Sequence, residues 1–471
     1  MPAMEQLELE DIQGLVARGY GDLNAACYLH LEIAQPDAAR VWLRAVAETI
    51  TTGRVKPSDR ALNIALTPSG LGKLGVPAAS LTMFAHEFIA GMTTDHTRRI
   101  LGDVDDSAPE RWAWGGPQTR PIDLVLLVFA ADRAVLATVR AELSRQLAAA
   151  QLVEVARLDT SDLDDREHFG FRDGISQPIV EGLGRTGPPG NTVRAGEFVL
   201  GYRNEYGQYT AGPVVRDTTG RSGGDGFDLG RNGTYLVFRQ LRQHVAAFWR
   251  FVDDATKNPD GSGDPAARLK LAAKLVGRWP SGAPLAMAPD RDNPELGDAS
   301  DFGYHKIDPH GFGCPIGAHI RRTNPRDSLD PSPGTDKSLA INKRHRLLRR
   351  GREYGPPLPM NDPATADSLG IVEEFETDRG LHFICLNANI GRQFEFVSHT
   401  WLNNPNFAGL YDDADPLVAG RSPFGCTFTV QAQPVRQRFS GLPQFVTVRG
   451  GAYFFLPGLR AIRYLANLGD S

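Results

Sequence analysis

The sequence predicts an α+β fold made of two ferredoxin-like halves, each a split βαβ unit whose helices cover one face of an antiparallel sheet. The chain has 471 residues, which is long for one compact core and indicates two domains. Up to residue 157 the expected elements follow the order β-α-β-β-α-β, and the second half shows a similar order. We therefore expect an N-terminal ferredoxin-like domain over residues 1–180 and a C-terminal one over residues 181–471.

Hydrophobic periodicity indicates the elements of the first half. Alternation and β-forming residues predict a strand over residues 25–33, while Trp42, Val46 and Ile50 have the spacing of a helix over residues 36–50. Apolar runs predict three more strands, and a segment rich in Ala, Leu and Arg predicts a second helix. These elements are the strands at residues 61–66, 122–129 and 152–157 and the helix at residues 133–147.

The second half contains fewer regular elements and more turn residues. Strands are expected at residues 233–240 and 379–387, each followed by a helix that begins near residue 244 or 390. The glycines Gly450 and Gly451 predict a hairpin that joins strands 444–449 and 452–456. A short helix is expected at residues 459–468, and residues 183–232 and 253–376 are expected to form long loops that carry function.

Composition excludes several classes of function. A net charge of -5 gives no reason to expect nucleic acid or an anionic membrane as a partner. The four cysteines form no C-x-x-C pair, which argues against zinc, iron–sulfur or covalently attached haem sites and suits a reducing compartment. From the acidic start we expect no export signal, and no apolar run is long enough to span a membrane. We expect a cytoplasmic protein.

Residues 167–178 place one carboxylate, Asp173, between two glycines in the motif Gly170-Phe-Arg-Asp-Gly174. Glycines beside an aspartate let the backbone bend tightly or come close to a bulky ligand. Taken alone, this motif is more typical of a surface turn, because Asp-Gly is a common turn dipeptide. Two stretches further along the chain change this interpretation.

The second stretch, residues 314–326, holds His319 among small and apolar residues, and the third, residues 342–355, is basic and includes Arg349. In this order the three stretches resemble the dye-decolouring peroxidase family. The first is similar to its G-x-x-D-G motif, the second to the segment with its iron-ligating histidine, and the third to the segment with its distal arginine. The resemblance covers nearly the whole chain and suits the longer, non-exported branch of the family.

The resemblance implies a haem-dependent peroxidase, with one non-covalent haem b per chain held mainly by the C-terminal half. It makes His319 the proximal iron ligand, Asp173 the distal acid–base and Arg349 the stabiliser of charge on the departing oxygen. Hydrogen peroxide would be reduced through a ferryl intermediate, which then oxidises phenols, aromatic dyes or similar donors. Because an unperturbed aspartate has a pKa of about 3.9, we expect the greatest activity in acid.

Neighbouring residues are implied to contact the haem. Ile175 and Ser176 should lie near the porphyrin, and Arg321 and Arg349 near its carboxylates. Arg322 is a further candidate for the carboxylates. The distal role of Arg349 has rivals in the same basic run, Arg344, Arg346 and Arg350.

The imidazole of His319 needs a hydrogen-bond acceptor, and the resemblance places it in the turn at residues 387–395. Asn389, Glu395 and a backbone carbonyl all remain open. Aromatic residues could relay electrons to bulky dyes at the surface, although core packing is the more common role of such side chains. The candidates for a relay are Trp249, Tyr354 and Trp401.

Two other functions suit the same haem scaffold. One is a haem-binding or haem-delivery protein without catalysis, which would need His319 but neither Asp173 nor Arg349. The other is a different haem chemistry, such as oxygenation or removal of the iron. The expected partners are hydrogen peroxide and an aromatic reducing substrate, and association of ferredoxin-like sheets leaves a homo-oligomer open.

Overall fold

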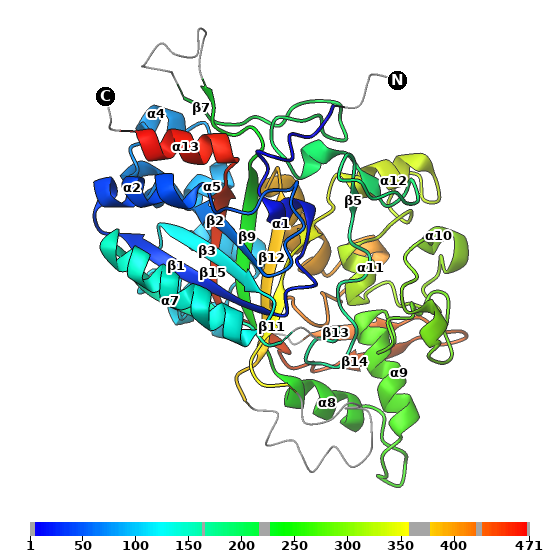
Figure 1. Cartoon of the computed structure of the whole chain (residues 1–471). Helices are drawn as coiled ribbons and strands as arrows, with labels where there is room; N and C mark the ends of the chain where they lie inside the picture. Colours follow the sequence, from blue (N-terminus) through cyan, green and yellow to red (C-terminus); the bar gives the residue numbers. More distant parts are fainter. Residues whose placement is uncertain (1–4, 163–164, 216–226, 358–376, 421–425, 469–471) are drawn as a thin grey trace.

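The computed structural model describes residues 5–162, 165–215, 227–357, 377–420 and 426–468 (Figure 1). Its centre is a nine-stranded sheet in the order β10-β12-β9-β15-β2-β3-β1-β4, with β11 beside β12. Every pair of neighbouring strands in this sheet is antiparallel. The strands are β1 Ala25–Ile33, β2 Arg60–Leu66, β3 Leu124–Ala130, β4 Leu152–Asp159, β9 Thr234–Gln243, β10 Leu348–Arg349, β11 Arg352–Tyr354, β12 Gly380–Asn387 and β15 Val446–Leu456.

The sheet consists of two halves with the same strand order. In the N-terminal half the order is β4-β1-β3-β2, and in the C-terminal half it is β15-β9-β12-β10. When the four strands of each half are numbered along the chain, both halves have the spatial order fourth, first, third, second. This is the arrangement of a split βαβ unit. The predicted fold class is confirmed, and the two sheets are joined into one where Phe455 of β15 pairs with Leu66 of β2. The domain boundary at residue 180 stays a prediction.

The predicted hairpin after residue 444 is wrong, because β15 runs through both glycines as one strand. Its register against β9 shifts between Val448 and Gly450, which marks a β-bulge. A Cβ added at Gly450 would lie 2.4 Å from the Trp114 ring nitrogen, and one at Gly451 would lie 2.9 Å from the Met92 sulfur. The glycines therefore permit close packing and do not make a turn. The missing second strand of this half is the short β10, inside the basic run.

The helices α2 (Pro36–Val46) and α7 (Arg133–Ala149) cover one face of the N-terminal half (Figure 1). Trp42 of α2 and Leu143 of α7 belong to the same buried core as Leu29 of β1 and Leu126 of β3. The Asp132 side chain caps α7 by accepting hydrogen bonds from the backbone N–H groups of the next turn. Helix α13 (Leu459–Asn467) packs against α2.

The opposite face of the sheet curls around a second core. The rings of Tyr28 in β1 and Phe238 in β9 lie 5.3 Å apart, although β15, β2 and β3 separate these strands in the sheet. His382 of β12 also lies 5.7 Å from the Tyr28 ring. Strands from both halves therefore share this core, which fixes the halves relative to one another.

The C-terminal half replaces regular helices with shorter elements and loops. Helix α8 (Val245–Asp254) packs on α9 (Pro265–Val276), and π-helical turns η7 (Gly391–Glu395) and η8 (Val397–Leu402) form the helix expected after residue 390. Helix α11 (His319–Thr323) and the hairpin of β13 (Thr427–Val430) and β14 (Gln437–Ser440) complete this side. Parts of both predicted loop regions, residues 216–226 and 358–376, lie outside the described residues.

The remaining elements are short. They are α1 Gly14–Ala17, α3 Pro68–Lys73, α4 Ala78–Leu81, α5 His86–Ala90, α6 Asp95–Leu101, α10 Tyr304–Ile307, α12 Asp336–Lys343, β5 Ile179–Val180, β6 Thr192–Val193, β7 Val214–Val215 and β8 Phe227–Asp228, with 3₁₀ turns between them. Among the helices of the described ranges, none combines the length and the apolar character that crossing a bilayer requires.

Candidate functional site

A cavity of about 320 Å³ lies against the C-terminal half of the sheet and brings together the predicted site residues. Its lining includes Asp173, Ile175 and Ser176 from the first motif, His319 from α11 and Arg349 from β10. These residues come from three distant stretches of the chain, and the sheet and its loops bring them to one cavity. Arg321 is not among the lining residues.

His319 is held by a buried carboxylate. Its Nδ1 lies 2.9 Å from Oδ2 of Asp415, which is fully buried and also accepts the backbone N–H groups of Leu417 and Val418. Burial alone would lower the pKa of His319, but the negative charge of Asp415 and its hydrogen bond to the ring together raise it. With Nδ1–H donating to Asp415, the neutral ring keeps Nε2 unprotonated, the form that binds a metal.

Sequence reasoning missed Asp415 and looked for the acceptor at residues 387–395. There, the Glu395 carboxylate accepts a 2.8 Å hydrogen bond from the Tyr453 hydroxyl, and the Asn389 side chain accepts one from the backbone of Arg392. Asp415 lies 96 positions beyond His319, in a loop with no recognisable motif. No spacing in the sequence connects the two residues, so only the fold identifies the pair.

Asp173 and Arg349 form an ion pair on the cavity wall, with 2.9 Å between Oδ1 and Nη1. Arg349 also donates from Nη2 to the carbonyl of Ile175, and its backbone N–H donates to the side chain of Gln177. Burial would raise the pKa of Asp173, but the charge of Arg349, the Gly174 N–H and the Arg349 hydrogen bond together lower it. Asp173 is therefore a carboxylate at neutral pH.

Three buried arginines converge on Ser176. Arg278 and Arg326 donate to its hydroxyl at 3.1 and 3.2 Å, and Arg346 donates to its carbonyl at 2.7 Å. Burial, helped by the charge of neighbouring arginines, lowers the pKa of Arg346 to about 9 and that of Arg278 to about 10. Within the described residues, none of the three forms an ion pair with a carboxylate.

The backbone at this arginine cluster is strained. Ser176 has a φ of 61° and Arg326 a φ of 58°, in the left-handed region that non-glycine residues rarely adopt. Such strain persists where surrounding structure fixes it, and it is common at ligand sites. Strain and uncompensated positive charge at the same point indicate a site for anionic groups.

The two arginines directly after His319 have other partners. Arg321 donates to the Asp308 carboxylate at 3.2 Å and to the carbonyl of Cys314 at 2.8 Å. Arg322 donates to backbone carbonyls, including those of Gly317 and Trp401. Both guanidinium groups therefore hold the loops around α11. The role predicted for Arg321 and Arg322, contact with the haem carboxylates, is one that the arginines at Ser176 could fill.

The chemistry of the cavity fits haem, which is a flat apolar ring with an iron centre and two carboxylates. Leu381, Phe383 and Val448 line the sheet side, and Val276 and Val397 line the side of the helices. His319 offers one imidazole for the iron, and the arginine cluster offers cations for the carboxylates. The residues present therefore match each part of the group.

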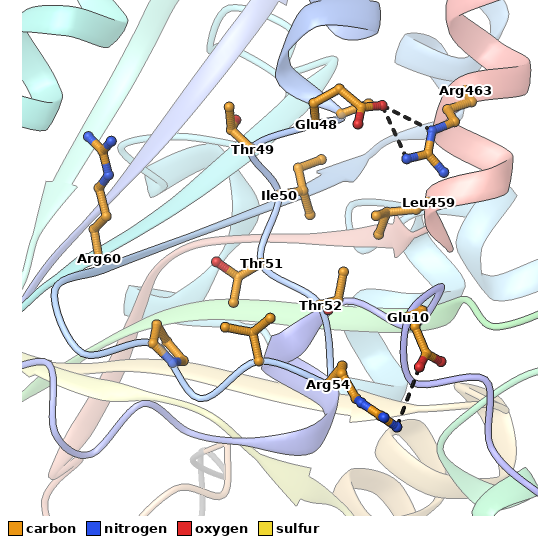
Figure 2. Close-up of a pocket in the computed structure, with 13 residues that line it drawn as sticks. Glu10, Glu48, Thr49, Ile50, Thr51, Thr52, Arg54, Arg60, Leu459 and Arg463 are labelled. Atoms are coloured by element: carbon orange, nitrogen blue, oxygen red, sulfur yellow. Dashed lines mark hydrogen bonds and ion pairs between the residues drawn. The ribbon is translucent and has the colours of Figure 1, made fainter.

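Another hollow lies on the N-terminal half, between α2, α13 and the segment before β2 (Figure 2). Its volume is about 560 Å³. Four of its charged side chains form two ion pairs, Glu10 with Arg54 and Glu48 with Arg463 (Figure 2), and the fifth, Arg60, pairs with Glu142. These ion pairs are solvent-exposed and contribute little to stability. The lining contains no histidine that could bind a metal.

Comparison with known proteins identifies the family. The chain is 31% identical over 439 residues to the dye-decolorizing peroxidase of Mycena epipterygia, a match that covers 86% of this chain and 76% of that protein. The chain belongs to the dye-decolouring peroxidase family. It is also 29% identical over 479 residues to the multifunctional dye peroxidase DyP2 of an Amycolatopsis species, covering 98% of this chain and 94% of that protein.

Solved structures agree with this assignment. A dye-decolorizing peroxidase in complex with 2,6-dimethoxyphenol has a TM-score of 0.79 and 26% identity, covering 98% of this chain and 100% of the other. The fungal peroxidase from Auricularia auricula-judae gives the same TM-score, identity and coverage. No model of a protein family matches the chain. As a dye-decolouring peroxidase, the chain is an enzyme that depends on haem.

Proposed function

We propose that this dye-decolouring peroxidase binds one haem b per chain through His319 and uses it to reduce hydrogen peroxide while oxidising phenols, aromatic dyes or similar donors. One observation carries the proposal. A single cavity holds an imidazole supported by a carboxylate, His319 with Asp415, and a carboxylate supported by a guanidinium, Asp173 with Arg349. A haem peroxidase needs both pairs, one for the iron and one for peroxide.

His319 would bind the iron through Nε2, and Asp415 would fix the orientation of the ring and raise its basicity. Arg326 and Arg346, supported by Arg278, would bind the haem carboxylates beside Ser176. Haem bound there would supply the iron at which the O–O bond of peroxide breaks and the oxidising equivalents that the donor consumes.

Asp173 would move the proton that this cleavage requires. Its carboxylate would accept a proton from one peroxide oxygen and return it to the other, which would leave as water. Arg349 would stabilise the negative charge that grows on the departing oxygen through its guanidinium group. Since Asp173 acts as a base only when ionised, its lowered pKa keeps this step active in acid until the pH falls through that pKa.

The reducing substrate is proposed from the relatives. The relatives named above include dye peroxidases, and a structural neighbour is a complex with a phenol, 2,6-dimethoxyphenol. An aromatic donor is therefore the substrate class that we propose for this chain.

The competing function is haem-iron removal. A match of 29% identity over 239 residues connects the chain to a deferrochelatase of Yersinia pestis, but it covers only 50% of this chain and 35% of that protein. A haem carrier gains nothing from an ionised Asp173 beside Arg349, and turnover of peroxide without loss of haem iron would exclude iron removal. The peroxide reaction therefore separates these functions from the proposed one.

The test is stopped-flow absorbance of the haem-loaded protein mixed with hydrogen peroxide, for wild type and Asp173→Asn. We expect a rapid Soret change in the wild type, with a rate constant about 10²- to 10⁴-fold lower in the variant. Asp165→Asn is the matched control, because Asp165 lies at the start of the same loop with a side chain that is 64% exposed.

Two results would contradict the proposal. A wild-type haem spectrum that peroxide leaves unchanged would indicate a carrier. Loss of haem iron during the reaction, with the porphyrin intact, would indicate the deferrochelatase chemistry. Equal peroxide rates in wild type and Asp173→Asn would remove Asp173 from its role while leaving the peroxidase activity.

A further inference from the structure

A second buried carboxylate, Glu167, lies in the loop that carries Asp173. Its Oε2 accepts the backbone N–H of Phe169 at 2.9 Å, and its Oε1 accepts that of Phe171 at 2.9 Å. The side-chain amide of Gln243, at the end of β9, donates to Oε2 at 2.6 Å. One carboxylate thus connects two amides of the loop to the central sheet.

The hydrogen bonds of this loop lead directly to Asp173. The backbone of Glu167 pairs with that of Phe171, and the N–H of Asp173 donates to the carbonyl of Asp165 at 2.9 Å. The loop is therefore a small hairpin that turns at Gly170, where φ is 97°. The Glu167 carboxylate closes the turn, and Asp173 stands at the open end, opposite Arg349.

Glu167 and Gln243 line the same cavity as Asp173 and His319. Burial raises the pKa of Glu167 to about 7, against the opposing effect of its three hydrogen bonds. The charged groups that act on it are carboxylates, Asp173 in its own loop and Glu353 of β11, and the group facing it from β9 is the neutral Gln243. Glu167 therefore changes its charge near neutral pH.

The side chain of Gln243 can accommodate that change. Its Oε1 is buried and has no hydrogen-bond partner in the part of the chain that the structure describes. When Glu167 carries a proton, rotation of the amide brings this oxygen to the Glu167 hydroxyl as an acceptor. The oxygen that then carries the hydrogen is a weaker acceptor for the N–H of Phe169, so one tie of the loop loosens.

We propose that Glu167 is a positioning residue for the peroxide reaction, because its ionised carboxylate holds the loop that presents Asp173 opposite Arg349. This inference rests on the proposed function of Asp173. Small displacements of a reacting group lower rates steeply, so a looser loop should slow proton transfer without abolishing it. The ionised form of Glu167 is expected to be the faster one.

The experiment measures the rate constant for peroxide in the haem-loaded enzyme from about pH 5 to about pH 9, on either side of the pKa of Glu167. In the wild type we expect the rate constant to rise about tenfold through a step near neutral pH. Glu167→Gln should remove the step and keep the lower rate at every pH. Infrared spectroscopy of the same samples should show one titrating carboxyl fewer in this variant.

Glu353→Gln is the matched control. Burial also raises the pKa of Glu353 to about 7, but this residue does not line the cavity and, in the described structure, no loop amide donates to its side chain. This variant should lose one infrared band and retain the step in the peroxide rate, moved toward lower pH because the negative charge of Glu353 near Glu167 is gone. If Glu167→Gln fails to fold, Gln243→Leu is used instead. It removes a hydrogen bond that lowers the pKa of Glu167, so the step should move to higher pH.

Each outcome supports the inference or overturns it. A step that persists unchanged in Glu167→Gln, or that does not move in Gln243→Leu, overturns the role of Glu167 while the peroxidase function stands. Loss of the step in Glu353→Gln would assign the step to Glu353 and would overturn the role of Glu167. A wild-type enzyme inert to peroxide at every pH overturns the proposed function and this inference together.

Discussion

The two halves of the sheet have the same strand order but differ in what covers the same face. In the N-terminal half, α2 and α7 lie flat on that face and fill it with apolar side chains such as Trp42 and Leu143. In the C-terminal half, the first helix, α8, packs on α9 and lies below the ends of the strands (Figure 1). The face that α8 leaves open is the wall of the cavity, lined by Leu241, Phe383 and Val448.

This difference shows how one topology serves as scaffold and as site. Displacing one helix opens a face, and the long loops of the C-terminal half bring His319, Asp415 and the arginine cluster to it. The N-terminal half keeps its helices in place and stays apolar. Substitutions in the two halves should therefore have separable effects, on the cofactor and its chemistry in one and on stability in the other.

The largest effect is expected from Arg349→Leu in the C-terminal half. Loss of the guanidinium should lower the peroxide rate constant about 10²- to 10³-fold, as removal of one charge-stabilising donor does in other enzymes. Because Arg349 lowers the pKa of Asp173, the variant should also lose its remaining rate at a higher pH than the wild type as acid is added.

Stopped-flow rates across the acid range measure both effects. Arg344→Leu is the control from the same basic run, since Arg344 stacks on Tyr206 at 4.0 Å and is not part of the cavity lining. An acid limit that stays in place in Arg349→Leu would contradict the coupling of the two residues.

A smaller effect is expected from Asp415→Asn, which keeps the shape of the side chain but removes its charge. Loss of a partner behind a metal ligand commonly lowers affinity or activity about 10- to 100-fold. We expect haem to transfer from the variant to an acceptor haem protein that much faster. Glu395→Gln should leave the transfer unchanged, because the Glu395 carboxylate bonds to Tyr453 and does not line the cavity. Equal transfer from wild type and Asp415→Asn would contradict the support of His319 by Asp415.

The smallest effect on the site is expected from Leu143→Ala in the N-terminal half. Leu143 is 5% exposed on the buried face of α7. Its truncation should lower the free energy of unfolding, measured by urea denaturation, by about 2–5 kcal/mol. The Soret spectrum and the peroxide rate constant of the folded variant should equal those of the wild type. A changed spectrum would show that the halves are not separable.

Much of the fold followed from local patterns. The strand at residues 25–33 was predicted with its observed bounds, because its apolar and β-forming residues suit a strand that is buried on both faces of the sheet. The hairpin predicted at Gly450-Gly451 was wrong, because these glycines are required by the close packing of Trp114 and Met92, which come from another part of the chain. Strand β10 was missed because two residues, Leu348 and Arg349, are too short for any periodicity.

The site was predictable where its residues sit in dense motifs. Asp173, His319 and Arg349 were found in such motifs, and the fold brings them to one cavity. Asp415 and Arg278 lie outside any motif and contribute through contacts across the fold, so they became visible only in three dimensions. Arg321 has the right position along the sequence but points toward Asp308, which spacing alone does not indicate.

Strand β15 has a consequence for the order of events during synthesis. It follows every other strand along the chain, yet it forms part of the cavity wall through Val446 and Val448 and makes the pairing that joins the halves. The N-terminal half can fold while the ribosome is still translating the rest. The haem pocket is incomplete until β15 has left the ribosome. We therefore expect the whole chain to be synthesised without haem and to bind it afterwards.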